Sequence, residues 1–249
     1  MDLGLKGRTA LVTGGAAGIG AAIALELARE GCDVAIVDVR RDEKAEATLA
    51  ALAGAGVRAT FHTADVRDFS LAERTVREVA AAAGRLDVLV CCAGVTDDAL
   101  SWKMTEAQWD RVLDVNLKGC FAYCRAAGAL MKDARAGRIV NIASINGLRG
   151  KFGQANYAAS KGGMVALSKT LARELGKFGV TVNVVAPGMV RTEMAAVLPP
   201  EVIEKAVDET MLGRLAEPRD CAAVVAFLCS EAARHVTGQV VQVDGGQYL

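Results

Sequence analysis

The segment Thr9–Gly20, TALVTGGAAGIG, joins a short run rich in β-branched residues to a glycine-rich turn. Residues 9–13 have the composition of a buried strand, and residues 21–30 continue with the apolar spacing of a helix that stops at Gly31. A second apolar run, CDVAIVD at Cys32–Asp38, completes a strand–turn–helix–strand unit. Such a unit binds nucleotides, because glycines let the backbone approach a pyrophosphate and a helix start favours an anion.

The glycines of the turn, Gly14, Gly18 and Gly20, have the spacing Gly-x3-Gly-x-Gly. Asp38 closes the second strand 18 positions after Gly20. A carboxylate at that place accepts hydrogen bonds from the ribose hydroxyls of a dinucleotide and repels a 2′-phosphate. The sequence therefore predicts a dinucleotide site that prefers NAD to NADP.

Two arginines that follow Asp38 keep NADP open as the less favoured cofactor. The guanidinium groups of Arg40 and Arg41 could hold a 2′-phosphate, or they could lie solvated at the start of a helix. The turn itself offers no basic residue, because positions 15–17 are Gly, Ala and Ala. NAD therefore remains the expected cofactor.

The composition is that of one large α/β domain covering residues 1–249. Hydrophobic residues make up 52% and aromatic residues 4%, which suits a parallel sheet packed with small aliphatic side chains. The net charge of zero and the isoelectric point of about 6.7 give no reason to expect nucleic acid or an anionic membrane as a partner. The charged start Met1–Lys6 contains no apolar signal segment, so we expect a cytoplasmic protein.

Seven cysteines are scattered along the chain, mostly among apolar residues, which is typical of reduced and buried thiols. Cys91 and Cys92 are adjacent and would point to opposite faces of a strand. Cys120 and Cys124 share a helix face, but neither histidine of the chain is near them in sequence. These spacings match no known ligand pattern, so we expect no metal site.

Strand and helix patterns alternate to the end of the chain. This order predicts an α/β fold with a single doubly wound Rossmann domain, in which a parallel seven-stranded sheet has helices on both faces. The later strands are expected at residues 58–62, 86–92, 138–143, 181–186 and 240–243. The later helices are expected at residues 70–83, 105–131, 154–177 and 218–230. Such sheets bind ligands at the carboxyl ends of their strands.

Residues 189–214 interrupt this alternation. The segment follows a strand end and contains Pro199 and Pro200. We expect it to form a substrate-binding lid over the ligand, with a pair of surface helices as the alternative.

Tyr157 and Lys161 are four residues apart, which places both side chains on one face of a helix. An ammonium group beside a phenol favours the phenolate and lowers the pKa of the tyrosine from about 10 towards neutrality. The pair is therefore a candidate proton donor and acceptor near pH 7.

Together these motifs resemble the short-chain dehydrogenase/reductase family, and the resemblance extends from Gly7 to about Gly246. The glycine turn at residues 13–20 is similar to the cofactor turn of that family. Tyr157 and Lys161 match its Tyr-x3-Lys pair. The motifs are specific as a set, because they occur in the expected order along almost the whole chain.

The resemblance implies four catalytic residues. Tyr157 would pass the proton to or from the substrate oxygen, while Lys161 would lower the pKa of Tyr157 and hold the nicotinamide ribose. Ser144 would donate a hydrogen bond to the substrate oxygen, and Asn116 would hold a water molecule that links Lys161 to solvent.

The resemblance also implies further cofactor contacts. Asp65 and Val66 are similar to the pair that contacts adenine, and Pro187, Gly188 and Thr192 to the segment that holds the nicotinamide carboxamide. The other cofactor contacts implied are Ile19, Cys91, Ala93, Gly94 and Val190. The sequence Cys-Cys-Ala-Gly at residues 91–94 departs from the Asn-Asn-Ala-Gly usual in the family, which removes side-chain amides that would brace the sheet.

By this resemblance the chain is an oxidoreductase that transfers a hydride between NAD(H) and a secondary alcohol or ketone. Residues 153–161 and 213–215 look most like the 3-oxoacyl-thioester reductase branch, which implies a 3-hydroxyacyl or 3-oxoacyl thioester as the small-molecule substrate. One alternative is NADPH-dependent reduction of a 3-oxoacyl carrier protein, and another is a non-catalytic cofactor-binding subunit of a hetero-oligomer. The family also implies a homo-oligomer, with a tetramer favoured.

Overall fold

The computed structural model describes residues 3–249, apart from the side chain of Met194. Residues 1 and 2 of the predicted domain lie outside this described part. Within it, seven strands form one parallel sheet in the order β3-β2-β1-β4-β5-β6-β7. The strands are β1 (Thr9–Thr13), β2 (Asp33–Asp38), β3 (Ala59–Thr63), β4 (Val88–Cys91), β5 (Gly137–Ile142), β6 (Val180–Pro187) and β7 (Val240–Val243).

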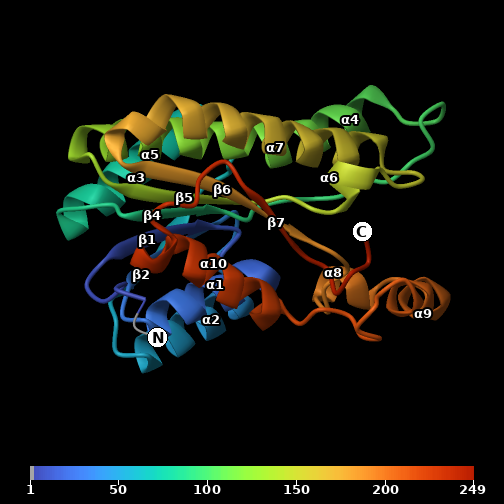
Figure 1. The fold of residues 1–249 in the computed structure, drawn as a ribbon, viewed down its shortest axis with the longest axis horizontal. Helices are drawn as coiled ribbons and strands as arrows, with labels where there is room; N and C mark the ends of the chain where they lie inside the picture. Colours follow the sequence, from blue (N-terminus) through green and yellow to red (C-terminus); the bar gives the residue numbers. More distant parts are fainter. Residues whose placement is uncertain (1–2) are drawn as a thin grey trace.

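Helices cover both faces of the sheet (Figure 1). On one face lie α3 (Phe69–Ala83), α5 (Gly119–Ala134) and α7 (Ala155–Leu175), and on the other lie α1 (Gly18–Arg29), α2 (Glu43–Gly54) and α10 (Pro218–Cys229). The remaining helices are α4 (Glu106–Leu113), α6 (Asn146–Arg149), α8 (Glu193–Ala196) and α9 (Pro200–Asp208). The central strands are buried on both faces, as β5 and β6 are along their whole length, so each face has its own aliphatic core.

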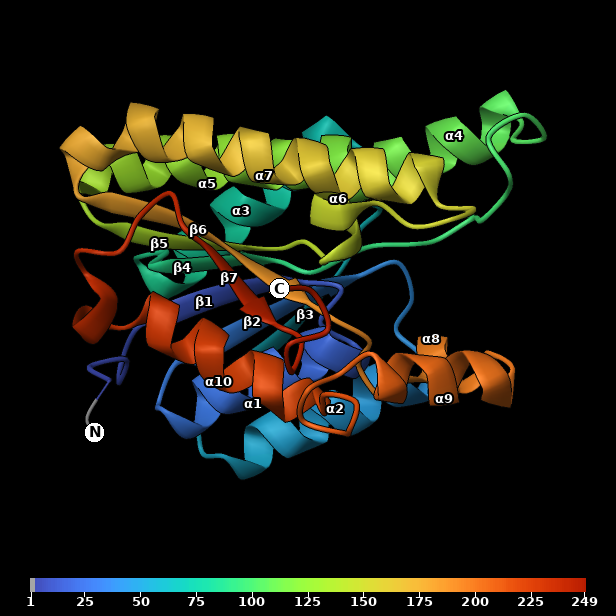
Figure 2. The same ribbon diagram turned by 45° about the vertical axis from the view of Figure 1, so that its right-hand side comes forward.

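The strand order reverses its direction between β1 and β4, because the chain first builds outward through β2 and β3 and then returns to the other side of β1. At such a reversal the loops leave the carboxyl ends of neighbouring strands in opposite directions and open a crevice. In Figure 2 the short helices α6, α8 and α9 lie near this edge of the sheet. We therefore expect a ligand to bind at this edge of the sheet.

All the predicted strands are present, with ends within two residues of the expected positions. The helix expected at residues 105–131 is interrupted by a π-helical turn at Asp114–Lys118, between α4 and α5. Helix α2 is absent from the prediction because its apolar stripe is thin: only Ala45, Thr48 and Leu52 are buried. The predicted lid at residues 189–214 contains α8 and α9, and its movement stays a prediction.

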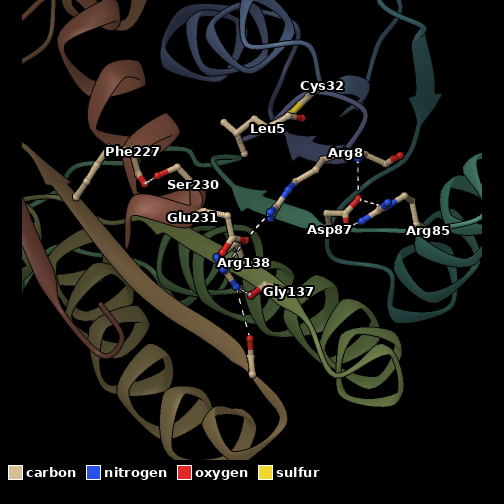
Figure 3. Close-up of polar contacts among 12 residues, drawn as sticks. Leu5, Arg8, Cys32, Arg85, Asp87, Gly137, Arg138, Phe227, Ser230 and Glu231 are labelled. Carbon is tan, nitrogen blue, oxygen red and sulfur yellow. Dashed lines mark hydrogen bonds and ion pairs between the residues drawn. The ribbon is translucent and has the colours of Figure 1, made fainter. Parts of the chain in front are cut away.

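The amino-terminal edge of the sheet is held by ion pairs, shown in Figure 3. Glu231 bridges Arg8 and Arg138, at 2.5 and 3.2 Å. Asp87 forms a bidentate pair with Arg85, at 2.6 and 2.7 Å. Arg8 and Arg138 lie at the start of β1 and β5, so the Glu231 pairs connect these two strands at the end opposite the crevice. Asp87, directly before β4, also accepts the Thr9 N–H of β1 at 2.9 Å.

The first prediction concerns the contact between Gly20 and Gly14. A Cβ on Gly20 would overlap the Gly14 carbonyl oxygen, so Gly20→Ala should force the β1–α1 turn apart. We expect the free energy of unfolding to fall by about 2–4 kcal/mol, a size typical of an overpacked buried site. Urea unfolding measures this change.

Gly54→Ala is the matched control, because a Cβ on Gly54 meets nothing within 4 Å and the residue is helical. Its stability should be unchanged or slightly higher. Equal urea midpoints for Gly20→Ala and the wild type would contradict the packing argument.

Candidate active site

A cleft of about 740 Å³ opens at the carboxyl edge of the sheet. Its wall is formed by the glycine turn, the ends of β2, β3 and β4, and the segment that follows β6. The predicted cofactor residues in this wall are Gly14, Gly18, Ile19, Gly20, Asp38, Asp65, Val66, Ala93, Gly94 and Thr192. Residues that are far apart in sequence thus face one cleft.

The glycine turn presents the start of helix α1 to the cleft. The N–H groups of Gly14 and Gly15 donate to the Val37 carbonyl, at 2.8 and 3.3 Å, which holds the turn against β2. The N-cap residue is Ala17, whose methyl group cannot cap the helix. The first-turn N–H groups and their partial positive charge are therefore available to an anion, and this arrangement fits a pyrophosphate.

Asp38 stands in the cleft wall at the end of β2. Its Oδ1 accepts the Val39 N–H at 2.8 Å, and its Oδ2 accepts the Ala16 N–H at 3.3 Å. These two contacts orient the carboxylate beside the glycine turn, where the ribose hydroxyls of a dinucleotide could reach it.

The two arginines after Asp38 have different surroundings. Arg41 pairs with Glu46 at 2.6 Å and lies 5.9 Å from the centre of the Phe61 ring. Arg40 is exposed and belongs to the cleft wall. Arg41 is therefore already engaged away from the cleft, and Arg40 is the arginine placed to meet a 2′-phosphate.

Asp65 and Val66 lie further along the same wall, with Arg67. The Arg67 guanidinium forms a bidentate pair with Asp65, at 2.6 and 3.0 Å, and this hydrogen-bonded pair lowers the pKa of the Asp65 carboxyl. Val66 packs closely on Gly119, where a Cβ would come within 2.8 Å of the valine. A charged and an apolar group thus lie side by side in the part of the cleft expected to receive adenine.

A second cavity of about 230 Å³ contains the predicted catalytic side chains Ser144, Tyr157 and Lys161. The predicted nicotinamide-holding residues Pro187, Gly188 and Val190 line it as well. The residues that line both cavities are Ile19, Cys92, Gly94 and Thr192. The two cavities are therefore continuous, and a dinucleotide lying in the first would bring its far end into the second.

Ser144 and Tyr157 meet in the second cavity. The backbone N–H of Asn146 donates to Ser144 Oγ at 3.1 Å, which leaves the serine hydroxyl proton free to point elsewhere. The Ser144 hydroxyl is hydrogen-bonded to the Tyr157 phenol. A substrate oxygen between the two hydroxyl groups could therefore receive two hydrogen bonds.

Lys161 is buried one turn further along α7. Its Nζ donates to the Ile142 carbonyl at 2.7 Å and lies 5.7 Å from the centre of the Tyr157 ring. Burial lowers the pKa of Lys161. A Cβ on Gly94 would lie 3.4 Å from this Nζ, so the lysine reaches the cofactor side of the cavity.

The pKa of Tyr157 differs from the sequence-based expectation. Burial raises the pKa of Tyr157 to about 12, and the Ser144 hydrogen bond only partly opposes this rise. The lysine points at the Ile142 carbonyl rather than at the phenol. In the protein without ligand, the Tyr157–Lys161 spacing alone does not bring the phenol towards neutrality, because desolvation is the largest influence on its pKa.

Asn116 lies in the π-helical turn and is fully buried. Its Oδ1 accepts the Val95 N–H at 2.8 Å, and its Nδ2 donates to the Val95 carbonyl at 3.0 Å and to Ser160 Oγ at 3.1 Å. The side chain thus binds the β4 loop to helix α7. The water-holding role implied by the resemblance stays a prediction.

Sequence reasoning missed Asn156, which is fully buried directly before Tyr157. Its Oδ1 accepts the Tyr157 N–H at 2.7 Å, while its Nδ2 donates to the carbonyls of Asp97 and Gln108, at 2.9 and 3.0 Å. Asn156 therefore fixes the start of α7 against α4 and the loop before it. A single polar residue at a helix start gives no sequence signal for such a role, because both carbonyls come from distant positions.

One cofactor residue needs correction. The Cys91 side chain is buried and packs towards Cys120 and Cys124 on α5, whereas Cys92 lines both cavities. The two adjacent side chains point to opposite faces, as the alternation of a strand requires. Cys92 therefore takes the place in the wall that the sequence analysis gave to Cys91.

Known proteins are similar to this chain over nearly its whole length. A family model described as enoyl-(acyl carrier protein) reductase matches residues 14–247. The 3-oxoacyl-[acyl-carrier-protein] reductase FabG of Staphylococcus aureus is 43% identical over 242 residues, which cover 97% of this chain and 98% of the relative. The human (3R)-3-hydroxyacyl-CoA dehydrogenase is 42% identical over 255 residues, covering 98% and 97%.

A solved structure from Sinorhizobium meliloti, named for a short-chain alcohol dehydrogenase, superposes with a TM-score of 0.92. It is 36% identical in sequence, and the match covers 97% of this chain and 96% of that one. No helix among residues 3–249 is long and apolar enough to cross a membrane.

The second prediction follows from the buried phenol. We expect Tyr157 of the cofactor-free protein to stay protonated until its pKa of about 12 is reached. The measurement is the ultraviolet absorption of the phenolate during an alkaline titration. Subtracting the titration of Tyr157→Phe from that of the wild type isolates the signal of Tyr157. Because an unfolded tyrosine ionises near pH 10, the stability that Tyr157 contributes should be complete below about pH 10 and lost as the pH rises towards 12.

Tyr123→Phe is the control, because Tyr123 is buried in the helix layer and lines neither cavity. The Tyr157 phenolate signal should be unchanged in this variant. A phenolate that appears between pH 7 and 9 in the wild type and vanishes in Tyr157→Phe would contradict the prediction.

Proposed function

The chain belongs to the short-chain dehydrogenase/reductase family, and we propose that it interconverts 3-oxoacyl and 3-hydroxyacyl thioesters with NAD(H). It is an oxidoreductase that acts on hydroxyl or keto groups. The observation that most directly supports the proposal is the continuity of the two cavities, which joins the dinucleotide cleft to Ser144 and Tyr157.

The chemistry divides between cofactor and protein. A nicotinamide bound between the two cavities supplies the hydride and accepts it in the reverse direction. The chain holds the proton at Tyr157 Oη and releases it to the substrate oxygen. Ser144 Oγ, oriented by the Asn146 N–H, donates to the same oxygen and steadies the negative charge that develops there. Lys161 adds a fixed positive charge behind the phenol.

Two contacts support NAD over NADP. The Asp38 carboxylate is held in the cleft wall by two backbone N–H groups, so it would face a 2′-phosphate as a like charge. Arg41 is engaged by Glu46 and does not line the cleft. Arg40 alone is placed to oppose this effect, because it is exposed in the wall.

The wall of the second cavity supports a thioester rather than a free acid. Its apolar part is formed by Ile145, Met189, Val190, Ala195 and Leu198. Arg149 also lines the cavity, but its guanidinium is paired with Glu209 at 3.2 Å and donates to the Gln247 carbonyl at 3.2 Å. A substrate carboxylate would have to compete with Glu209 for this cation. The exposed Lys151 also lines the cavity and could meet a charged group of the substrate at its rim. The apolar lining beside Ser144 suits an uncharged acyl group.

We also place the protein in the cytoplasm as a homo-oligomer, with a tetramer favoured. The seven cysteines are all free, and six of them are buried, which suits a reducing compartment. Phe121 on α5 is exposed in the single chain. Its apolar side chain would be covered if α5 packed against another copy of the chain. Neither nucleic acid nor a membrane is proposed as a partner.

The third prediction tests the reaction. Purified protein should reduce acetoacetyl-CoA with NADH, followed at 340 nm, and more slowly with NADPH. Tyr157→Phe should lower kcat by about 10²–10⁴-fold, the usual value of a positioned proton donor, while NADH binding survives. Tyr123→Phe is the matched control and should keep wild-type turnover.

The other outcomes separate the alternatives. Turnover of a secondary alcohol or ketone without turnover of the thioester would contradict the proposed substrate. The proposed hydride-transfer reaction would still stand. NADH binding with no turnover of any such compound would favour the non-catalytic subunit. Full turnover in Tyr157→Phe would contradict the assignment of Tyr157 as the proton donor.

The fourth prediction tests the cofactor preference. Asp38→Ser removes the negative charge that faces the 2′ position. The ratio of kcat/KM with NADPH to kcat/KM with NADH should therefore rise by about 10- to 100-fold, or about 1.4–2.8 kcal/mol. Glu43→Gln on α2 removes a nearby exposed charge outside the cleft wall and should leave the ratio unchanged. A ratio that moves equally in both variants would mean that long-range charge, rather than Asp38, sets the preference.

A further inference from the structure

Three cysteine side chains meet in the core between β4 and α5. Cys91 is the last residue of β4, and Cys120 and Cys124 lie one turn apart at the start of α5. The Sγ atom of Cys124 is 3.8 Å from that of Cys91 and 3.9 Å from that of Cys120. Among residues 3–249, this is the one group of three cysteine, histidine or acidic side chains whose potential ligand atoms all lie within 4.8 Å of one another.

The arrangement depends on the fold rather than on any local spacing. Cys91 and Cys120 are 29 residues apart in the chain. Strand alternation sends Cys92 to the cleft and leaves Cys91 facing α5. Neither the Cys91–Cys92 pair nor the Cys120–Cys124 pair alone provides more than two ligands.

We propose that Cys91, Cys120 and Cys124 form a thiolate site for a divalent, thiophilic cation of the zinc type. The Sγ separations of 3.8 and 3.9 Å are close to those of two sulfur atoms that share a metal ion at the usual Zn–S bond length of about 2.3 Å. Soft sulfur ligands select zinc and similar metals over magnesium or calcium.

Asn141 supplies a neutral group that could complete the site. Its Oδ1 is 3.4 Å from Cys124 Sγ, and its Nδ2 donates to Ser168 Oγ at 2.9 Å. This second contact directs the oxygen towards the thiols. A small inward shift would bring the oxygen to the ion as a fourth ligand, which gives the tetrahedral geometry that zinc prefers.

Charge favours a divalent over a monovalent ion. Three thiolates around a divalent cation leave one negative charge, whereas a monovalent ion would leave two. Lys161 is buried close enough to interact electrostatically with Cys91 and Cys120. Its single positive charge balances the divalent complex, and a buried charge without such a partner would be costly.

Binding is a ligand exchange without oxidation or reduction. Three S–H bonds break, three metal–sulfur bonds form, and three protons pass to the buffer. Cys120 is the nearest of the three to solvent, with 5% of its surface exposed, and it follows the π-helical turn. The ion would join β4, whose continuation lines the cleft, to the helix that follows Asn116. We therefore expect the folded state to be stabilised.

The test uses full-length, fully reduced protein and Cd²⁺ or Zn²⁺ as the probe. Equilibrium dialysis with metal analysis should find one ion per chain, and Cd²⁺ should produce a thiolate-to-cadmium charge-transfer band. The thermal unfolding midpoint should rise on loading. Cys124→Ala should raise the Kd by at least about 100-fold, because one of the few strong ligands is lost. Cys229→Ala, a buried cysteine on α10 outside the group, should bind as the wild type does.

Cys120→Ala is the second variant, should Cys124→Ala fail to fold, because Cys120 is the least enclosed of the three. Circular dichroism verifies folding before each titration. Three results would each overturn the proposal: no bound ion in the wild type, an ion retained with unchanged Kd in the folded variants, or an unfolding midpoint lowered by the metal. The last result would mean that the metal binds thiols exposed on unfolding.

Discussion

The hydrogen bond from Lys161 Nζ to the Ile142 carbonyl is the contact on which the arrangement of the site depends. It joins the first third of helix α7 to the last residue of β5, and Ser144 follows that strand by two residues. A charged donor removed from water needs an acceptor of this kind, because an unpaired buried ammonium group would be expensive. The bond therefore sets the distance between the helix that bears Tyr157 and the strand that bears Ser144. Asn116 and Asn156 then attach the same helix to the β4 loop and α4.

Much of the fold could be predicted because parallel strands buried on both faces leave a strong pattern. β5 and β6 are entirely buried and rich in valine and isoleucine, although Arg138, Asn141, Thr181 and Asn183 interrupt their apolar runs. Helix α2 could not be predicted in the same way, since a helix at the outside of the domain needs few apolar residues. The π-helical turn at Asp114–Lys118 left no sequence signal either. Asn116 in this turn hydrogen-bonds to Val95 and Ser160, partners that the fold brings near it only once it has formed.

The site was predictable where a residue type is required by its chemistry, and less so where its surroundings decide. Glycines at the β1–α1 turn, the acid at the end of β2 and the Tyr157–Lys161 pair belong to the first kind. Cys91 and Cys92 belong to the second. Their sequence predicts opposite faces, but which of them faces the cofactor depends on the register of β4, where Cys91 pairs with Thr13 and Asn141. The polar contacts of Asn156 likewise come from loops whose paths the sequence does not reveal.

The raised pKa of Tyr157 determines whether the ligand-free site is ready to donate a proton or to accept one. With a pKa of about 12, the phenol keeps its proton throughout the physiological range. A protonated phenol hydrogen-bonded to Ser144 is the form that can deliver a proton to a carbonyl oxygen, whereas alcohol oxidation needs a form that can accept one. The buried cation that would favour the second form donates to the Ile142 carbonyl. The scaffold by itself therefore holds the acid needed for reduction, and the opposite direction requires additional positive charge near the phenol to overcome the cost of burying the phenolate.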